Sequence, residues 1–122
     1  MKTIALIEDN PDNRLLIRTI LEDKYQIVEC DTSTGALVCL RSNKPDAILL
    51  DISLPEMDGT ELLQLIRNDP ALKKLPVIAL TAHAMSGDRE KYLACGFNDY
   101  VAKPIVDETI LMKTLEKYLP SS

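Results

Sequence analysis

The stretch Ala47-Ile48-Leu49-Leu50-Asp51 places four apolar residues in a row directly before an acid. Two other stretches, Ile4-Ala5-Leu6-Ile7 and Val77-Ile78-Ala79-Leu80, have the same uninterrupted apolar character. Strands covered by helices on both faces are apolar at every position, whereas strands with one wet face alternate. The three stretches therefore predict the central strands of a parallel sheet, with bounds Thr3–Ile7, Ala47–Leu50 and Val77–Leu80.

Two further segments complete the predicted sheet. Ile27–Cys30 lies in a run of mixed polarity, which favours an outermost strand, and Tyr100–Ala102 is the fifth strand. Right-handed crossovers between such strands predict an α/β fold, a flavodoxin-like three-layer α/β/α sandwich with five parallel strands in the order 2-1-3-4-5. The intervals are long enough for one helix each, expected at 11–23, Ser33–Arg41, Asp58–Arg67, Ser86–Ala94 and Asp107–Leu119.

Local signals support these boundaries. Asn10-Pro11-Asp12 offers an N-cap, a proline at the first helical position and an early acid. Gly96 follows the fourth predicted helix, where a glycine commonly ends a helix. All seven prolines fall outside the predicted strands, as a central sheet requires.

Length and charge limit the classes of function. A chain of 122 residues without repeat or linker predicts one domain, residues 1–122. Its 14 basic and 19 acidic residues give a net charge of −5, which disfavours binding to nucleic acid and to anionic membranes. The longest apolar run, Ala36-Leu37-Val38-Cys39-Leu40, is far shorter than the roughly 18–20 residues of a membrane-spanning helix.

The cysteines predict a reducing environment. Cys30, Cys39 and Cys95 are odd in number, scattered and without C-x-x-C spacing. This pattern favours buried, reduced thiols over disulfides or a zinc site, and hence a cytoplasmic location.

Polar residues follow the predicted strands where each one ends. Glu8 and Asp9 follow the first strand, Asp51 the third, Thr81 the fourth and Lys103 the fifth. Because the carboxyl ends of parallel strands meet at one edge, we expect the three acids to converge there. Carboxylates that close need a counter-ion, and an all-oxygen set with room for water suits Mg²⁺, with Mn²⁺ as the alternative.

Asp51 is the best candidate for chemistry at this edge. It ends a central strand and precedes a loop in which we expect the Ser53 carbonyl to ligate the metal. With Lys103 opposite the metal, the Asp51 carboxylate would lie between two positive charges, and Thr81 could donate a hydrogen bond to an incoming group. This arrangement predicts attack by Asp51 on a phosphoryl group, giving an aspartyl phosphate.

These residues resemble those of the receiver domains of two-component response regulators, and the resemblance covers the whole chain. Glu8-Asp9 is similar to the acidic pair of that family, and Asp51 with Leu54-Pro55-Glu56-Met57-Asp58-Gly59 is similar to its phosphoacceptor segment. Thr81-Ala82 and Lys103-Pro104 resemble its hydroxyl and lysine positions, and Tyr100 resembles its switch aromatic.

The resemblance implies a phosphoacceptor module and not an enzyme that acts on other substrates. It implies Mg²⁺-dependent transfer to Asp51 from a sensor histidine kinase or a histidine phosphotransfer protein, slow self-catalysed dephosphorylation, and a downstream protein partner. The phosphorylated state would draw the Thr81 hydroxyl inward and let the Tyr100 ring turn. The Lys103-Pro104 bond is a place where a cis peptide is tolerable. Receivers of this kind are free-standing or belong to a hybrid kinase or larger regulator, and both remain open.

Each residue also has an ordinary structural reading. Glu8 and Asp9 suit a solvated loop, Lys103 suits the protein surface, and Tyr100 suits an edge aromatic packed on the sheet. His83 reads as a loop residue near the mouth of the site, since no second His or Cys is nearby in sequence. The joint occurrence of acids, hydroxyl and lysine at successive strand ends favours the functional reading.

Three other functions compete. An aspartyl-nucleophile phosphatase would carry a second acid two residues after Asp51, where this chain has Ser53, and would add a cap domain. A nucleotide or flavin binder would need a glycine-rich loop after a strand, and the four glycines form none. An interaction module that is never phosphorylated would have no need of the acids, Thr81 and Lys103.

Overall fold

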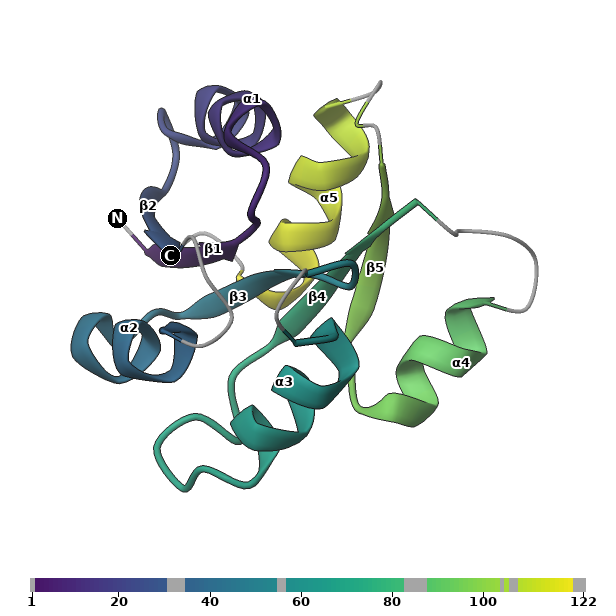
Figure 1. Ribbon diagram of the computed structural model, residues 1–122. Helices are drawn as coiled ribbons and strands as arrows, with labels where there is room; N and C mark the ends of the chain where they lie inside the picture. Colours follow the sequence, from purple (N-terminus) through teal and green to yellow (C-terminus); the bar gives the residue numbers. More distant parts are fainter. Residues whose placement is uncertain are drawn as a thin grey trace.

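The computed structural model describes residues 2–30, 35–54, 57–82, 88–103, 105 and 108–119. Strands and helices alternate strictly along them, and Figure 1 shows the helices on both faces of a twisted central sheet. The elements are β1 Thr3–Ile7, α1 Pro11–Leu21, β2 Gln26–Cys30, α2 Ala36–Asn43, β3 Ala47–Asp51, α3 Gly59–Arg67, β4 Val77–Thr81, α4 Asp88–Cys95, β5 Asp99–Ala102 and α5 Glu108–Tyr118.

The sheet confirms the predicted topology. All strands are parallel and their order is β2-β1-β3-β4-β5, with the mixed-polarity strand β2 at one edge. The register pairs Ile7 with Leu50, Asp51 with Leu80 and Thr81 with Ala102. Glu8, which follows Ile7, is therefore level with Asp51, so the carboxyl ends of the central strands form one edge.

Two apolar cores lie on the two faces of the sheet. Side chains at alternating positions of the strands separate between them, as in Ile48 and Leu50 on one face and Leu49 on the other. Helices α2, α3 and α4 cover the first face and helices α1 and α5 the second (Figure 1). Every residue of β3 and β4 is buried, which explains their continuous apolar sequence.

Caps fix most of the helix ends near their predicted positions. The Asn10 side chain accepts hydrogen bonds from the backbone N–H groups of Asp12 at 2.9 Å and Asn13 at 3.1 Å, so α1 begins at Pro11. Gly96 has φ +114°, a conformation that ends α4 and that side chains rarely adopt. Helix α2 ends at Asn43, two residues later than predicted, at Lys44 in the left-handed region. The predicted helix starts at Ser33, Ser86 and Asp107 lie outside the described residues.

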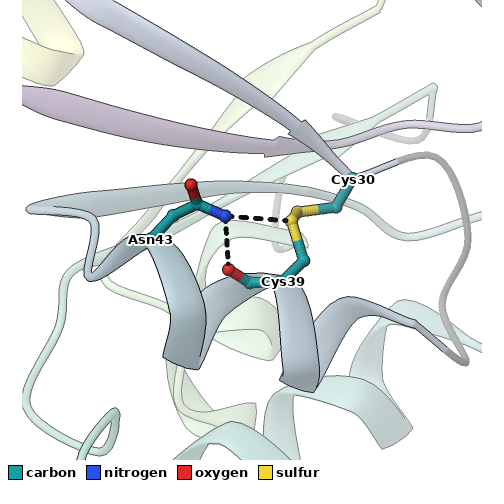
Figure 2. Close-up of a disulfide and its surroundings, with 3 residues drawn as sticks. All are labelled: Cys30, Cys39 and Asn43. Carbon is teal, nitrogen blue, oxygen red and sulfur yellow. Dashed lines mark hydrogen bonds between the residues drawn. A yellow bond between two sulfur atoms is a disulfide. The ribbon is translucent and has the colours of Figure 1, made fainter.

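The prediction of reduced thiols is wrong for two of the three cysteines. Cys30 and Cys39 form a disulfide (Figure 2), whereas Cys95 is free. Cys30 ends β2, and Cys39 lies on the face of α2 that packs on the same apolar core, so folding brings the two Cα atoms to 6.3 Å. This proximity depends on how α2 crosses the sheet and is not visible in the spacing of the cysteines.

The described helices are too short or too polar to cross a lipid bilayer.

Candidate functional site

Three carboxylates meet at the carboxyl edge of the sheet. Glu8 and Asp9 follow β1, Asp51 ends β3, and each offers one oxygen such that all three atoms lie within 4.8 Å of one another. Glu8 and Asp51 are buried, with 0% and 1% of their surface exposed, whereas Asp9 faces solvent. Burying two acids side by side is unfavourable unless a positive charge accompanies them.

Lys103 supplies part of that charge. Its ammonium Nζ lies 3.0 Å from Asp51 Oδ1 and 3.2 Å from Glu8 Oε1. The residue follows β5, and its backbone N–H donates a hydrogen bond of 2.8 Å to the Thr81 carbonyl, which extends the β4–β5 pairing. One lysine therefore pairs with two buried acids.

The pKa values reflect this imbalance. Burial, together with a hydrogen bond to Asp51 and the charge of Asp51, raises the pKa of Glu8 to about 7. Burial also opposes the charge on Asp51, but hydrogen bonds from Glu8, from the Ser53 backbone and from Lys103 outweigh it and lower the pKa of Asp51. For Lys103, burial is outweighed by the two carboxylates, which raise its pKa. Asp51 is thus the anion of the pair.

The acidic cluster fits a hard divalent cation. When Glu8 is ionised, its Oε2 is one of the few buried polar side-chain atoms of the described residues without a hydrogen-bond partner. An unpaired buried carboxylate oxygen is costly unless something binds it. Three carboxylates with no nitrogen or sulfur ligand among them match the preference of Mg²⁺ and Mn²⁺ for oxygen.

The loop after β3 is hydrogen-bonded to the Asp51 side chain and lies close to the backbone of Asp51 and Ile52. The Ser53 N–H donates a 3.0 Å hydrogen bond to Asp51 Oδ1, and the Gly59 N–H donates one of 2.9 Å to the Ile52 carbonyl. A Cβ on Gly59 would clash with the Asp51 carbonyl oxygen and lie 2.7 Å from the Ile52 Cα, so only glycine fits at this approach. The Ser53 carbonyl as a metal ligand stays a prediction.

The neighbouring strand β4 brings a hydroxyl group to the same edge of the sheet. Thr81, the last residue of β4, is buried, and its hydroxyl lies 2.8 Å from the Tyr92 hydroxyl on α4. The Tyr92 ring is 5.9 Å from the Tyr100 ring and 6.1 Å from the Phe97 ring, centre to centre. Tyr100, the aromatic expected to act as the switch, is half-buried, and its ring packs against the Tyr92 ring.

Sequence reasoning missed Tyr92 and Arg14. Tyr92 could have been found from one signal only: a tyrosine on the buried face of a helix needs a hydrogen-bond partner for its hydroxyl. Arg14 Nη1 donates hydrogen bonds to the carbonyls of Glu8 at 2.8 Å and Asp9 at 3.1 Å, which fixes the turn after β1. Nothing in the sequence distinguishes Arg14 from other surface arginines. His83 and Pro104 lie outside the described residues. The predicted place for a cis peptide, the Lys103-Pro104 bond, therefore stays a prediction.

Comparison with known proteins identifies the family of the chain. The family model of the response regulator receiver domain matches residues 4–116. The chain belongs to that family. Receiver domains of two-component systems are phosphoacceptor signalling domains, and this receiver domain shares that role.

Relatives of this receiver domain occur in two settings. It is 45% identical over 121 residues to the signal transduction histidine-protein kinase BarA of Escherichia coli K12, covering 98% of the chain but 13% of the kinase. It is 37% identical over 119 residues to the polar-differentiation response regulator DivK of Brucella anthropi, covering 97% of the chain and 96% of DivK. The chain thus spans a small part of one relative and almost all of the other.

A solved structure resembles this receiver domain in sequence and in shape. The receiver domain of the sensor histidine kinase PA1611 from Pseudomonas aeruginosa PAO1 is 36% identical, with a TM-score of 0.86 and 98% coverage of both chains. That structure has a magnesium ion coordinated in its active site cleft.

Proposed function

We propose that Asp51 is the residue of this receiver domain that accepts the phosphoryl group. The observation that carries the proposal is the ion pair of 3.0 Å between Asp51 and Lys103 beside the buried Glu8. An acceptor carboxylate must be ionised to attack phosphorus, and the lowered pKa of Asp51 supports that state.

The step is an in-line displacement at phosphorus. An Asp51 carboxylate oxygen forms the new P–O bond, the P–N bond of a phosphohistidine breaks, and the imidazole leaves with its electron pair and takes up a proton. The Lys103 ammonium, already in contact with Asp51, balances the charge of the phosphoryl oxygens. The Ser53 N–H donates a hydrogen bond to the same carboxylate oxygen, Asp51 Oδ1, and so helps to hold the side chain in place.

Glu8, Asp9 and Asp51 would hold Mg²⁺, together with the Ser53 carbonyl, and Mn²⁺ would fit the same oxygens. When bound, the ion supplies positive charge that offsets the negative charge of the phosphoryl group. The magnesium in the PA1611 receiver domain supports this assignment. Arg14 positions the metal-binding pair by holding the carbonyls of Glu8 and Asp9.

The switch that follows phosphorylation involves Thr81, Tyr92 and Tyr100. A phosphoryl oxygen on Asp51 attracts the Thr81 hydroxyl, which must then exchange its 2.8 Å contact with the Tyr92 hydroxyl for the phosphate. The Tyr100 ring, packed against Tyr92, moves with it. A local change of charge thereby reaches α4 and β5, where a partner protein would read it.

The partners follow from the family and from charge. The kinase relative supports a sensor histidine kinase or a histidine phosphotransfer protein as the phosphoryl donor, and a downstream protein as the target. We place the domain in the cytoplasm, where such donors act. The net charge of −5 disfavours nucleic acid as the target. An enzyme acting on other substrates is the lesser candidate, and turnover of a phosphate monoester would revive it.

A phosphorylation assay tests the acceptor. The full chain is incubated with acetyl phosphate and MgCl₂, and intact mass and peptide mapping locate the phosphoryl group. We expect one phosphoryl group on Asp51, lost in Asp51→Asn and retained in Asp69→Asn. Asp69 is a matched control, because it is also a poorly exposed acid, paired at 2.6 Å with Arg41, but lies before β4 at the other end of the sheet. Phosphorylation of Asp51→Asn at the wild-type level would overturn the assignment.

A further inference from the structure

The Cys30–Cys39 disulfide lies next to the site in the fold. Cys30 pairs with Ile7 in the β1–β2 register, and the residue after Ile7 is Glu8. The bond joins this end of β2 to α2, across a sequence separation of nine residues (Figure 2). It therefore restrains the edge strand at the height of the acidic cluster.

Polar contacts lead from Glu29, the neighbour of Cys30 in β2, to the backbone carbonyls of Glu8 and Asp9. Glu29, which precedes Cys30, lies 3.8 Å from Arg14 Nε and 2.9 Å from Arg18 Nη1. Arg14 in turn donates hydrogen bonds to the Glu8 and Asp9 carbonyls. The position of β2 is thus coupled through one arginine to the turn that carries two of the acids.

The two sulfur atoms differ in their surroundings. Cys30 is 4% exposed, whereas Cys39 is half-buried on α2. The Asn43 amide donates to the Cys39 carbonyl at 2.8 Å and to Cys39 Sγ at 3.8 Å, as Figure 2 shows. Cys39 is therefore the more exposed of the two residues and the one open to attack by an external thiolate. Because an N–H group directed at sulfur favours the thiolate, Asn43 also makes Cys39 a good leaving group once it is in a mixed disulfide.

We propose that Cys30 and Cys39 form a reversible thiol–disulfide exchange site whose redox state sets the affinity of the acidic cluster for divalent cations. Its reaction partners are small thiols of the glutathione class or protein dithiols. The proposal rests on the proposed function, because a receiver domain that works beside its kinase meets a reducing compartment. Disulfides there are usually transient and redox-sensing rather than permanent.

The exchange between the disulfide and external thiols needs no other oxidant or reductant. An external thiolate attacks Cys39 Sγ, forms a mixed disulfide and releases the Cys30 thiolate, which takes a proton. A second external thiolate attacks the outer sulfur of the mixed disulfide and releases Cys39 as thiolate beside Asn43. Two thiols are oxidised to one disulfide while Cys30 and Cys39 are reduced to two thiols. Oxidised glutathione reverses the sequence.

The bond favours metal binding, because it holds β2, and with it the contact of Glu29 with Arg14, in place. Reduction frees that end of β2 and loosens the turn that carries Glu8 and Asp9. We expect reduction to raise the Mg²⁺ dissociation constant by about threefold or more, less than the roughly 10- to 100-fold that loss of a supporting partner of a metal ligand costs.

The experiment uses the full chain in two glutathione buffers, one reducing and one oxidising. Alkylation followed by mass spectrometry counts the free thiols, and calorimetric titration with MgCl₂ gives the dissociation constant in each state. We expect one alkylated cysteine, Cys95, in the oxidised state and three in the reduced state, with weaker Mg²⁺ binding in the latter. Cys95→Ser should keep the redox effect, whereas Cys39→Ser and Arg14→Ala should remove it.

The outcomes separate this inference from the proposed function. Equal Mg²⁺ affinity in both states would overturn the coupling and leave the metal site intact, and so would three free thiols in oxidising buffer. A redox effect that survives in Arg14→Ala would overturn the route through the arginine. Failure of Mg²⁺ to bind in either state would overturn the proposed function itself.

Discussion

The two halves of the site hold their side chains by different forces. In the acidic half, formed by Glu8, Asp9, Asp51 and Lys103, the two buried acids Asp51 and Glu8 share the Lys103 ammonium at 3.0 and 3.2 Å. In the hydroxyl half, formed by Thr81, Tyr92 and Tyr100, the Thr81 and Tyr92 hydroxyls form a neutral hydrogen bond of 2.8 Å. Both halves lie at the same edge of the same sheet.

The difference separates binding from switching. Buried charges that are only partly compensated are expensive to hold and gain much from a bound cation, so the acidic half is prepared for a ligand. A hydroxyl–hydroxyl bond contributes about 1 kcal/mol, so the hydroxyl half can rearrange when a stronger partner arrives. Changes to the acidic half should therefore have large effects on stability and metal binding, and changes to the hydroxyl half smaller effects on the switch.

Removal of the lysine should have the largest effect. Lys103→Met leaves Asp51 and Glu8 without their cation, and breaking a buried ion pair on one side costs about 3 kcal/mol or more. Urea unfolding without Mg²⁺ measures the loss. Lys24→Met is the control, because its pair with Glu116 is exposed to solvent and should contribute little to stability. Equal losses in the two variants would contradict the charge imbalance of the acidic half.

The pH dependence of stability should follow Glu8. Its pKa is raised from 4.5 to about 7, so the folded protein holds a proton there that the unfolded chain has lost. Without metal, this contribution to stability is fully present below pH 4.5 and disappears as the pH rises to about 7, a change on the order of 3 kcal/mol. The pKa of Asp51 is lowered, so its contribution to stability is present above pH 3.8 and is lost only as the pH falls below that value, outside this window.

Denaturant unfolding at several pH values checks this dependence. The stabilisation by saturating Mg²⁺ should grow over the same window, because the ion replaces the proton on Glu8. Glu8→Gln should flatten both curves. A wild-type curve that stays level between pH 4.5 and 7 would show that Glu8 is not held protonated.

A smaller effect is expected in the hydroxyl half. Tyr92→Phe removes the contact with Thr81, which should cost about 1 kcal/mol of stability and raise the rate of phosphorylation by acetyl phosphate by up to about fivefold. The matched control is Tyr118→Phe, which loses a 2.8 Å hydrogen bond to the Asn98 carbonyl away from Thr81. The control should lose similar stability and keep the wild-type rate. An unchanged rate in Tyr92→Phe would mean that Tyr92 does not restrain Thr81.

The smallest effect is expected at Ser53. The residue acts through its backbone, with its N–H on Asp51 and its carbonyl proposed for the metal, and its side chain is exposed. Ser53→Ala should change the Mg²⁺ dissociation constant by less than about twofold, within the ~0.5 kcal/mol of an ordinary surface substitution. A loss of tenfold or more would assign the metal contact to the hydroxyl instead.

The fold and the edge of the site were predictable because they depend on patterns along the chain. The uninterrupted apolar runs identify β1, β3 and β4, and the end of each run places Glu8, Asp51 and Thr81 at one edge. Each observed strand is at most one residue longer than its predicted bounds. The extra residues are polar residues at the ends of the apolar runs, which also pair with the neighbouring strand.

Contacts made by side chains of one element with a neighbouring element or turn were not predictable. The Cys30–Cys39 bond depends on how α2 crosses β2, and the Thr81–Tyr92 contact depends on the rotation of α4 about its axis. Arg14 acts on backbone carbonyls, which leave no pattern in the side chains. The uneven sharing of Lys103 between two acids follows from burial, which only the folded chain defines.

The most direct test of the acidic half is a calorimetric titration of the full chain with MgCl₂ at pH 7.5. We predict one Mg²⁺ ion per chain, with binding lost in the double variant Glu8→Gln/Asp51→Asn and retained in Asp69→Asn. Absence of binding by the folded wild-type protein, or equal binding by the double variant, would contradict the claim that the acids at the ends of β1 and β3 share a cation.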